Sequence, residues 1–239
     1  MIAELFIPCF VDQMYPETGH SMAKILKKAG VEVKYNKNQT CCGQVAFNSG
    51  FWDEAREVAK KFLDDFSGNN PVVCAGCSCS AFVKNNYHDL FEGTILYNHY
   101  TRLKNNMFEL TDFLVNVLKV NQLGSVFPHK VTIHDSCASL RDYKLKDEPR
   151  ILLRNVKGLE IIEIVDNEVC CGFGGTFSVK FPSISSAMVE QKVQNALNTG
   201  AEYITSVDSS CLMNIQSYIV QNNIPMKIIH IADILASGL

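Results

Sequence analysis

The stretch Cys170-Cys171-Gly172-Phe173-Gly174-Gly175-Thr176 contains an uncommon triplet, two adjacent cysteines followed by a glycine. The same triplet stands at Cys41-Cys42-Gly43, in the first half of this 239-residue chain. A single cysteine precedes each triplet, Cys9 by 31 intervening residues and Cys137 by 32, and each closes a short apolar run. Such a repeated spacing indicates an internal duplication.

Two further landmarks extend the repeat. Ser78-Cys79 matches Ser210-Cys211, and the largely apolar segment 108–114 matches segment 229–235. The four landmarks occur in the same order, offset by 121 to 132 residues. We therefore expect two related domains, residues 1–120 (the first half) and residues 121–239 (the second half).

Apolar residues within each half alternate between the patterns of strands and helices. Residues 4–8 and 31–35 are typical of strands, whereas residues 53–66 carry apolar side chains at helical spacing. Strands that alternate with helices form parallel sheets from βαβ units. The sequence therefore predicts an α/β fold of two duplicated, doubly wound parallel-sheet halves, related by a pseudo-two-fold axis.

Other segments give more detailed expectations. Residues 93–106 and 121–130 are expected to be irregular, and the second of these segments is the expected linker. Residues 111–118 predict a helix with Thr111 as its N-cap, and residues 160–165 predict a strand.

The composition is that of an ordinary globular protein, with 47% hydrophobic residues, 20% charged residues and a net charge of −3. A charge so close to neutral argues against a nucleic-acid-binding surface or a polybasic membrane patch. No apolar run reaches the roughly 20 residues that span a bilayer, and the apolar start, residues 1–10, lacks the basic segment of a secretory signal. We expect a cytoplasmic protein without a transmembrane segment.

Ten cysteines in such a chain indicate metal binding or redox chemistry, because disulfide frameworks are typical of small secreted proteins. In each half, the lone cysteine, the pair and the later cysteine follow three different predicted strands. Parallel strands end at one edge of a sheet, so three strand ends bring thiols to the same place. The glycine after each pair frees the backbone to turn N–H groups toward sulfur. The glycines of residues 172–175 do not fit the dinucleotide pattern G-x-G-x-x-G.

Cysteine sites without spaced histidines favour an iron–sulfur cluster or zinc. Cys74-Ala75-Gly76-Cys77 is the only C-x-x-C in the chain, and Ser206 and Ser209 stand at its positions in the second half. Paired zinc knuckles are therefore not expected. Cys74 and Cys77 are candidate extra ligands in the first half only, and a metal-free thiol–disulfide pair at either Cys74/Cys77 or Cys41/Cys42 is an alternative.

Three residues near the second cysteine set are candidates for a catalytic role: His134, Arg141 and Lys180. His134 could donate a proton or a hydrogen bond to a thiolate, or form a structural loop pair with Asp135. Arg141 and Lys180 could balance thiolate charge or meet a carboxylate, or simply lie on a solvated surface. The other histidines show no metal-ligand spacing and are expected to be structural: His20, His88, His99, His129 and His230.

The spacing of the cysteines resembles the cysteine-rich (CCG) domain family, twice over and along nearly the whole chain. The strings Asn48-Ser49-Gly50 and Lys146-Asp147-Glu148-Pro149 share this resemblance, as does the long stretch 170–180. Within the family the likeness is greatest to its lactate utilization A branch. The CCG-containing component of heterodisulfide reductase is a related member that also has two copies of the domain.

The resemblance implies an oxidoreductase subunit whose activity requires partners. It implies electron transfer through [4Fe–4S]-type clusters, noncubane in heterodisulfide reductase, within a cytosolic complex that oxidises L-lactate, a 2-hydroxy acid, to pyruvate. The implied partners are a second iron–sulfur protein and a small third subunit. The alternatives are a zinc-stabilised scaffold or interaction subunit, with zinc at one site, and a thiol–disulfide redox protein of the heterodisulfide reductase type.

The resemblance also implies two sets of ligands, transferred by position. The first set is Cys9, Cys41, Cys42 and Cys79, with Cys77 or Cys74 as a fifth cysteine. The second set is Cys137, Cys170, Cys171 and Cys211. The first site is therefore expected to have more ligands than the second.

Overall fold

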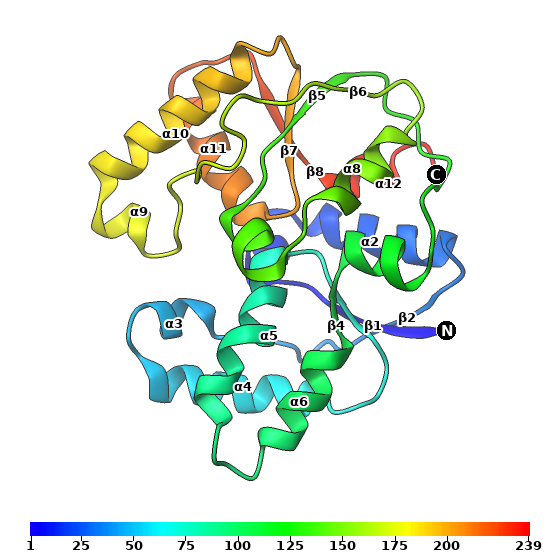
Figure 1. Ribbon diagram of the computed structural model, residues 1–239, viewed down its shortest axis with the longest axis vertical. Coiled ribbons are helices and arrows are strands. Elements are labelled where there is room, and N and C mark those ends of the chain that lie inside the picture. Colours follow the sequence, from blue (N-terminus) through cyan, green and yellow to red (C-terminus); the bar gives the residue numbers. More distant parts are fainter.

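Eight short parallel strands form two separate sheets in the computed structural model, which describes residues 1–239 (Figure 1). The first sheet has the strand order β2 (Glu32–Tyr35), β1 (Ile2–Phe6), β3 (Val72–Cys74) and β4 (Met107–Glu109). The second has the order β6 (Glu160–Ile161), β5 (Lys130–Ile133), β7 (Tyr203–Ser206) and β8 (Lys227–His230). The two sheets have the same order relative to the chain, so the predicted α/β fold of two duplicated parallel-sheet halves is confirmed.

The strand register fixes which residues of the two sheets are equivalent. Cys74 pairs with Phe6 on one side and with Glu109 on the other. Ser206 pairs with His230, and the N–H of His134 donates to the carbonyl of Thr205 and so continues β5 by one residue. Cys74 therefore corresponds to Ser206, as the sequence alignment of the halves predicts, and Phe6 corresponds to His134.

Helices cover both sheets, and their apolar spacing explains where they form. In α4 the buried residues Ala55, Ala59, Phe62 and Leu63 lie on one helical face. The helices of the first half are α1 (Cys9–Met14), α2 (Pro16–Lys28), α3 (Gln44–Asn48), α4 (Trp52–Asp65), α5 (Cys77–Phe91), α6 (Tyr97–Asn106), α7 (Leu110–Asp112) and the π-helix η1 (Phe113–Val117). Those of the second half are the π-helix η2 (Ala138–Tyr143), α8 (Asp147–Arg154), α9 (Phe177–Lys180), α10 (Pro182–Leu197), α11 (Ser209–Gln221) and α12 (Ile231–Ala236).

Three detailed predictions were wrong. Much of segment 93–106 is the helix α6, which is mostly polar and buries only Tyr100 and Leu103. Segment 111–118 is not one α-helix but α7 followed by η1, and its N-cap is Glu109, whose side chain accepts from the N–H groups of Thr111 and Asp112. Segment 160–165 pairs only as the two-residue strand β6, since the chain after it leaves the sheet.

The two halves share one apolar core. Helix α2, between the two sheets in Figure 1, packs against α12, and their side chains Met22, Ile25 and Leu235 belong to the same buried cluster of 25 residues. The hydroxyl of Thr18 also donates to Asp233 Oδ2 at 2.8 Å. Each half has a further apolar cluster of its own, of 18 residues in the first and 11 in the second. The shared core fixes the two sheets relative to each other, and this positions the site.

Candidate metal centre

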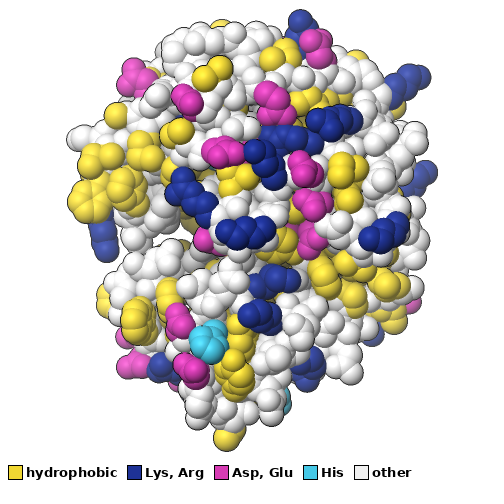
Figure 2. Space-filling model, in the orientation of Figure 1, with side chains coloured by type: hydrophobic (Ala, Val, Ile, Leu, Met, Phe, Trp, Pro, Cys, Tyr) yellow, Lys and Arg dark blue, Asp and Glu magenta, His cyan; other side chains and the backbone are white.

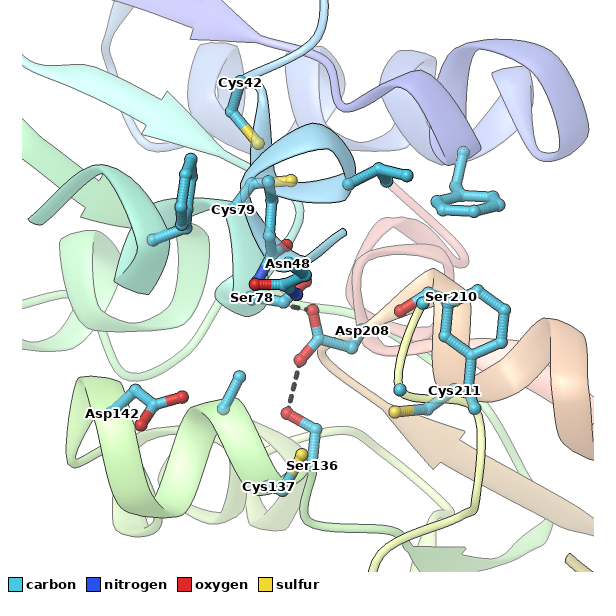
Figure 3. A pocket seen from close by; sticks show the side chains of 18 of the residues that line it. Cys42, Asn48, Ser78, Cys79, Ser136, Cys137, Asp142, Asp208, Ser210 and Cys211 are labelled. Carbon is cyan, nitrogen blue, oxygen red and sulfur yellow. Dashed lines mark hydrogen bonds between the residues drawn. The ribbon is translucent and has the colours of Figure 1, made fainter. Parts of the chain in front are cut away.

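One cavity of about 420 Å³ is lined by both halves of the chain (Figure 3). Its walls contain eight of the ten cysteines: Cys9, Cys41, Cys42, Cys79, Cys137, Cys170, Cys171 and Cys211. The structure thus brings together both predicted sets of four cysteines. All ten cysteines are free of disulfide bonds.

Each set is assembled at the carboxyl ends of three neighbouring strands, as expected for an open parallel sheet. In the first half, Cys9 begins α1 soon after β1, and Cys79 lies in the first turn of α5 after β3. In the second half, Cys137 immediately precedes η2 and Cys211 lies in the first turn of α11. The paired cysteines lie in loops: Cys41-Cys42 between β2 and α3, and Cys170-Cys171 between β6 and α9.

The glycine of each triplet is required by the local backbone. Gly43 and Gly172 have φ angles of 90° and 86°, in the left-handed region that favours glycine. A Cβ atom on Gly172 would lie 2.8 Å from the carbonyl oxygen of Ser185, at the start of α10. In this turn the N–H of each glycine donates to the sulfur of the first cysteine, at 3.4 Å for both Cys41 and Cys170. The triplet is therefore a tight turn that directs an N–H group at a thiolate.

The second cysteine of each triplet is anchored through its backbone. The hydroxyl of Tyr87, on α5, donates to the carbonyl of Cys42 at 2.8 Å. The side-chain amide of Asn214, on α11, donates to the carbonyl of Cys171 at 2.9 Å. Equivalent helices thus fix both pairs, and the two thiols of each pair stay on the cavity wall.

The thiols of the first cysteine set have very different pKa values. The pKa of Cys41 falls to about 2, chiefly because the Cys42 and Cys9 thiols hydrogen-bond to its thiolate. The Cys9 Sγ lies 3.9 Å from the Cys41 Sγ, and its own pKa is raised, first by this hydrogen bond and then by burial. Cys41 is therefore the thiolate, and the Cys9 and Cys42 thiols support it. Metal binding needs deprotonated cysteines, so it would release the remaining protons.

The second set repeats this arrangement. The pKa of Cys170 falls to about 2, first through a hydrogen bond from Cys137 and then through one from Cys171. The pKa of Cys171 is raised by its hydrogen bonds with Cys170 and Cys211 and by burial. The first cysteine of each triplet is therefore the thiolate in both halves.

Cys74 and Cys77 lie outside the cavity. Cys74, in the first-half cluster, donates to the carbonyl of Gly76 at 3.2 Å. Cys77 is fully buried in the core shared by the two halves, and burial raises its pKa. The first half therefore lines the cavity with four cysteines, and Cys74 and Cys77 are not among them.

His134 lies against the second set. Its side chain is buried, and neither ring nitrogen has a hydrogen-bond partner. A ring nitrogen and the sulfurs of Cys171 and Cys211 all lie within 4.8 Å of one another. Burial lowers the pKa of His134 to about 3, so the ring is neutral and can offer a lone pair.

The cation near the second set is Lys192, which the sequence interpretation missed. It is 1% exposed, and its ammonium donates to the carbonyls of Asp166 and Asn167 at 2.6 and 3.2 Å. Burial lowers its pKa, and the charges of Cys171 and nearby acids oppose that effect. The signal was available, because Lys192 interrupts the apolar face of α10 next to Val193. The predicted candidates Arg141 and Lys180 are both exposed, and neither lines the cavity.

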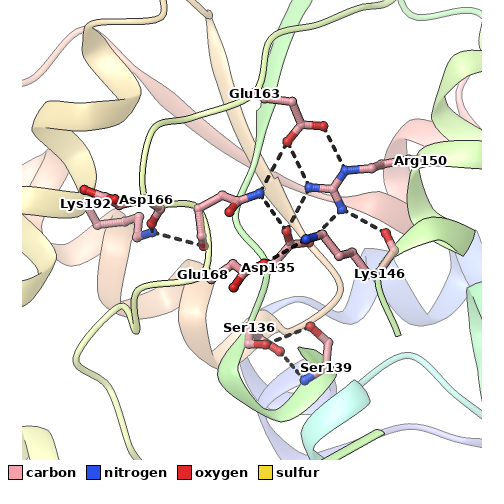
Figure 4. A network of polar contacts seen from close by, with 10 residues as sticks. Asp135, Ser136, Ser139, Lys146, Arg150, Glu163, Asp166, Glu168 and Lys192 are labelled. Carbon is pink, nitrogen blue, oxygen red and sulfur yellow. Dashed lines mark hydrogen bonds and ion pairs between the residues drawn. The ribbon is translucent and has the colours of Figure 1, made fainter. Parts of the chain in front are cut away.

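A partly buried ion-pair network holds the end of β5, next to His134 (Figure 4). The guanidinium of Arg150 donates to both carboxylate oxygens of Asp135, at 3.0 and 2.8 Å, and to both oxygens of Glu163, at 2.8 and 2.9 Å. Asn167 also donates to Asp135, at 3.0 Å. The network therefore ties the loop before Cys170 to the strand end before Cys137.

Asp208 connects the two halves at the cavity, as Figure 3 shows. Its carboxylate accepts from the N–H of Ser78, in the first turn of α5, at 2.9 Å and from the hydroxyl of Ser136. It is 2% exposed. Sequence reasoning missed this residue. An aspartate directly before a helix predicts a cap of that same helix, whereas the Asp208 side chain makes no bond to α11.

The cavity opens between α3 and the loop before α9, where Figure 2 shows the surface hollowed. Apolar side chains are exposed near both sides of this opening. They are Val45, Phe51 and Trp52 in the first half, and Val179, Phe181 and Ile184 in the second.

The donor set fits a thiophilic metal centre. Eight sulfurs in two groups suit iron–sulfur clusters or zinc, and N–H groups directed at two of them would support bound thiolate. None of the 24 residues that line the cavity is lysine, arginine or histidine. The negative charge of metal-bound thiolates would therefore be balanced by the metal itself and by groups behind the wall, such as Lys192.

Comparison with known proteins agrees with this site. A sequence profile of the CCG cysteine-rich domain matches residues 3–84 and 131–216, the two segments that contain the two cysteine sets. The chain belongs to the cysteine-rich (CCG) domain family.

Its curated relatives include proteins of similar length. Lactate utilization protein A 1 of Bacillus mycoides (strain KBAB4) is 42% identical over 98% of this chain and 96% of the relative. Lactate utilization protein A 2 of Bacillus cereus (strain Q1) is 40% identical over 100% of this chain and 99% of the relative.

Solved structures are more distant. An aspartate racemase homologue from Pyrococcus horikoshii OT3 is 14% identical, with a TM-score of 0.33 over 98% of this chain and 95% of that one. A glutamate racemase from Bacillus anthracis is 13% identical, with a TM-score of 0.38 over 99% of this chain and 78% of that one. These values carry no argument about chemistry.

None of the helices combines the length and the apolar character needed to cross a membrane.

Proposed function

We propose that this chain is an iron–sulfur oxidoreductase subunit of a complex that oxidises L-lactate to pyruvate. Each half would hold one [4Fe–4S]-type cluster: the first through Cys9, Cys41, Cys42 and Cys79, the second through Cys137, Cys170, Cys171 and Cys211. The observation that carries the proposal is the convergence of these eight cysteines on one cavity. The lactate assignment comes from the relatives' names, at about 40% identity along the whole chain.

The role proposed for this chain is electron transfer. Iron–sulfur clusters supply one-electron steps. The protein holds both cysteine sets on the walls of a single cavity and clamps its two halves together through Asp208. Gly43 and Gly172 each direct an N–H group at a sulfur, which stabilises negative charge there. The structure therefore suits a pair of centres held in fixed relation to each other.

We assign the oxidation of the hydroxy acid to a site that includes a partner subunit. The lactate carboxylate would enter the cavity without a lysine, arginine or histidine to meet it, and a carboxylate desolvated without a cation is strongly disfavoured. The proposed partners are a second iron–sulfur protein and a small third subunit. The exposed apolar side chains near the cavity opening, including Trp52 and Phe181, suit such a docking surface. The proposed compartment is the cytoplasm, where free thiols persist.

Anaerobic metal analysis tests this proposal. The chain is expressed and purified without oxygen, iron and acid-labile sulfide are measured per chain, and EPR spectra are recorded before and after reduction. We expect two clusters per chain in the wild type and one in each of two matched variants, Cys41→Ser/Cys79→Ser and Cys170→Ser/Cys211→Ser. A colourless anaerobic protein with stoichiometric zinc would instead establish a metal-stabilised scaffold. A folded, metal-free protein with reactive dithiols would establish thiol–disulfide chemistry.

A further inference from the structure

The two cysteine sets are equal in number, but only the second has a histidine behind it. The strand register places Phe6 in the first sheet where His134 stands in the second. Phe6 packs edge-on against Phe62, with ring centroids 4.7 Å apart, and belongs to an apolar cluster. His134 has no such partner ring and lies beside sulfur instead. The two halves therefore differ at this position, with a packing residue in the first and a donor residue in the second.

His134 is left with unsatisfied hydrogen-bonding groups at this position. Its side chain is 1% exposed and both ring nitrogens lack a partner, although buried polar groups nearly always have one. Leaving such a buried group unsatisfied destabilises the folded chain. A ligand on the ring would remove this cost, so the orphaned nitrogens point to a partner that binds there.

The distances suit a shared metal. A ring nitrogen of His134 and the sulfurs of Cys171 and Cys211 lie within 4.8 Å of one another. Around a tetrahedral metal, with bonds of about 2.3 Å to sulfur and about 2.0–2.1 Å to nitrogen, such ligand atoms are about 3.5–3.8 Å apart. The three atoms therefore need to close by only about 1 Å, a movement within the reach of side-chain torsions.

We propose that His134 is a direct nitrogen ligand of the second metal centre, beside Cys171 and Cys211, so that the two centres differ in their coordination. The first centre would be bound by four thiolates alone. The second would have four cysteines and an imidazole available, which reverses the expectation from sequence that the first site has more ligands. This inference rests on the proposed function, because it requires a metal in the second set.

Pulsed EPR on protein labelled with ¹⁵N-histidine tests the inference. Two anaerobic samples are compared, each reconstituted with ferrous iron and sulfide. Cys41→Ser/Cys79→Ser retains only the second centre, and Cys170→Ser/Cys211→Ser retains only the first. We expect a strong coupling to ¹⁵N, of the size given by a metal-bound imidazole, in the second centre alone.

Two further variants locate the nitrogen. His134→Phe, in the background that retains the second centre, introduces the residue of the first sheet and should abolish the coupling. His129→Phe, a histidine of the same half that bonds to Glu202 rather than to sulfur, should leave it intact. If His134→Phe fails to fold, the ¹⁵N coupling of the labelled Cys41→Ser/Cys79→Ser protein still decides whether a histidine nitrogen is bound to the second centre.

The outcomes separate this inference from the proposed function. An iron-loaded second centre without a directly bound nitrogen, or with a coupling that survives His134→Phe, overturns the inference and leaves the proposed function standing. A wild-type chain that takes up no iron overturns both.

Discussion

Asp208 of the second half accepts a hydrogen bond at 2.9 Å from the backbone N–H of Ser78 in the first half. The bond caps helix α5 with a carboxylate from outside its own half, and it lies on the wall of the cavity. In the first half the equivalent position is Gly76, which lies close to Pro8. Because glycine stands at this position in the first half, no carboxylate of the first half makes the corresponding bond to the second half. We call the bond between Asp208 and Ser78 the Asp208 clamp.

Asp208→Ala should lower the free energy of unfolding by about 1–3 kcal/mol, since it leaves the part-buried N–H of Ser78 and the buried hydroxyl of Ser136 without their acceptor. Urea denaturation checks this. Asp142→Ala is the matched control, because Asp142 lines the same cavity but is exposed. Equal stability of the two variants would contradict the clamp.

Cys79 and Cys77 provide a direct test of which cysteines bind metal. Both are buried in the first turn of α5, but only Cys79 lines the cavity. Cys79→Ser should therefore lose roughly half of the bound iron, since one of the two sites loses a ligand. Cys77→Ala should retain all of it. The measurement is the iron content per chain of both variants after anaerobic purification. A loss of iron in Cys77→Ala would show that Cys77 is a ligand.

Lys192 should raise the reduction potential of the second centre, because a buried positive charge stabilises the more negative, reduced state. Lys192→Met removes that charge. An interaction of about 1 kcal/mol corresponds to about 40 mV for one electron, so the potential should fall by tens of millivolts. EPR-monitored redox titration measures it. Lys180→Met, an exposed lysine on α9, should leave it unchanged, and an equal shift in both variants would exclude a specific role for Lys192.

Much of the site could be predicted because each cysteine group follows an apolar stretch that is typical of a strand. Strand ends in a parallel sheet share an edge. That the two edges face one cavity could not be predicted, since it depends on α2 packing against α12 across about 200 residues of chain. Such long-range packing leaves no local pattern.

The different surroundings of Cys77 and Cys79 have a simple physical cause. The sequence interpretation began the helix at residue 81, whereas α5 begins at Cys77. Two residues apart on a helix are separated by about 200° of rotation, so Cys77 and Cys79 face opposite sides. A helix start placed four residues earlier would have predicted that only one of these two thiols faces the cavity.

Arg150 should be the most costly polar residue to replace in the second half. Its side chain and that of Asp135 are 7% and 4% exposed, so Arg150→Met leaves a buried carboxylate without its cation. Loss of one partner of a buried pair costs about 3–5 kcal/mol. Lys146→Met breaks the exposed pair with Glu168 and should have little effect. Thermal unfolding of both variants tests this, and comparable losses would contradict it.

Glu109 should make the protein less stable as the pH rises. Its carboxyl group is fully buried at the end of β4, and burial raises its pKa from 4.5 to about 8. One oxygen accepts from the N–H groups of Thr111 and Asp112, while the other has no partner. The folded state therefore holds a proton at pH 7 that the unfolded chain releases. Since the folded state binds more protons between about pH 4.5 and 8, stability falls across that window.

Glu109→Gln keeps the accepting oxygen and removes the titration. Relative to this variant, the wild type should lose about 3–5 kcal/mol of unfolding free energy between pH 5 and pH 9, as expected for a shift of this size. Urea denaturation of both proteins over this range gives the comparison, and the difference between them cancels the titration of groups they share, the cysteines included. A difference that stays constant with pH would show that Glu109 is ionised in the folded protein.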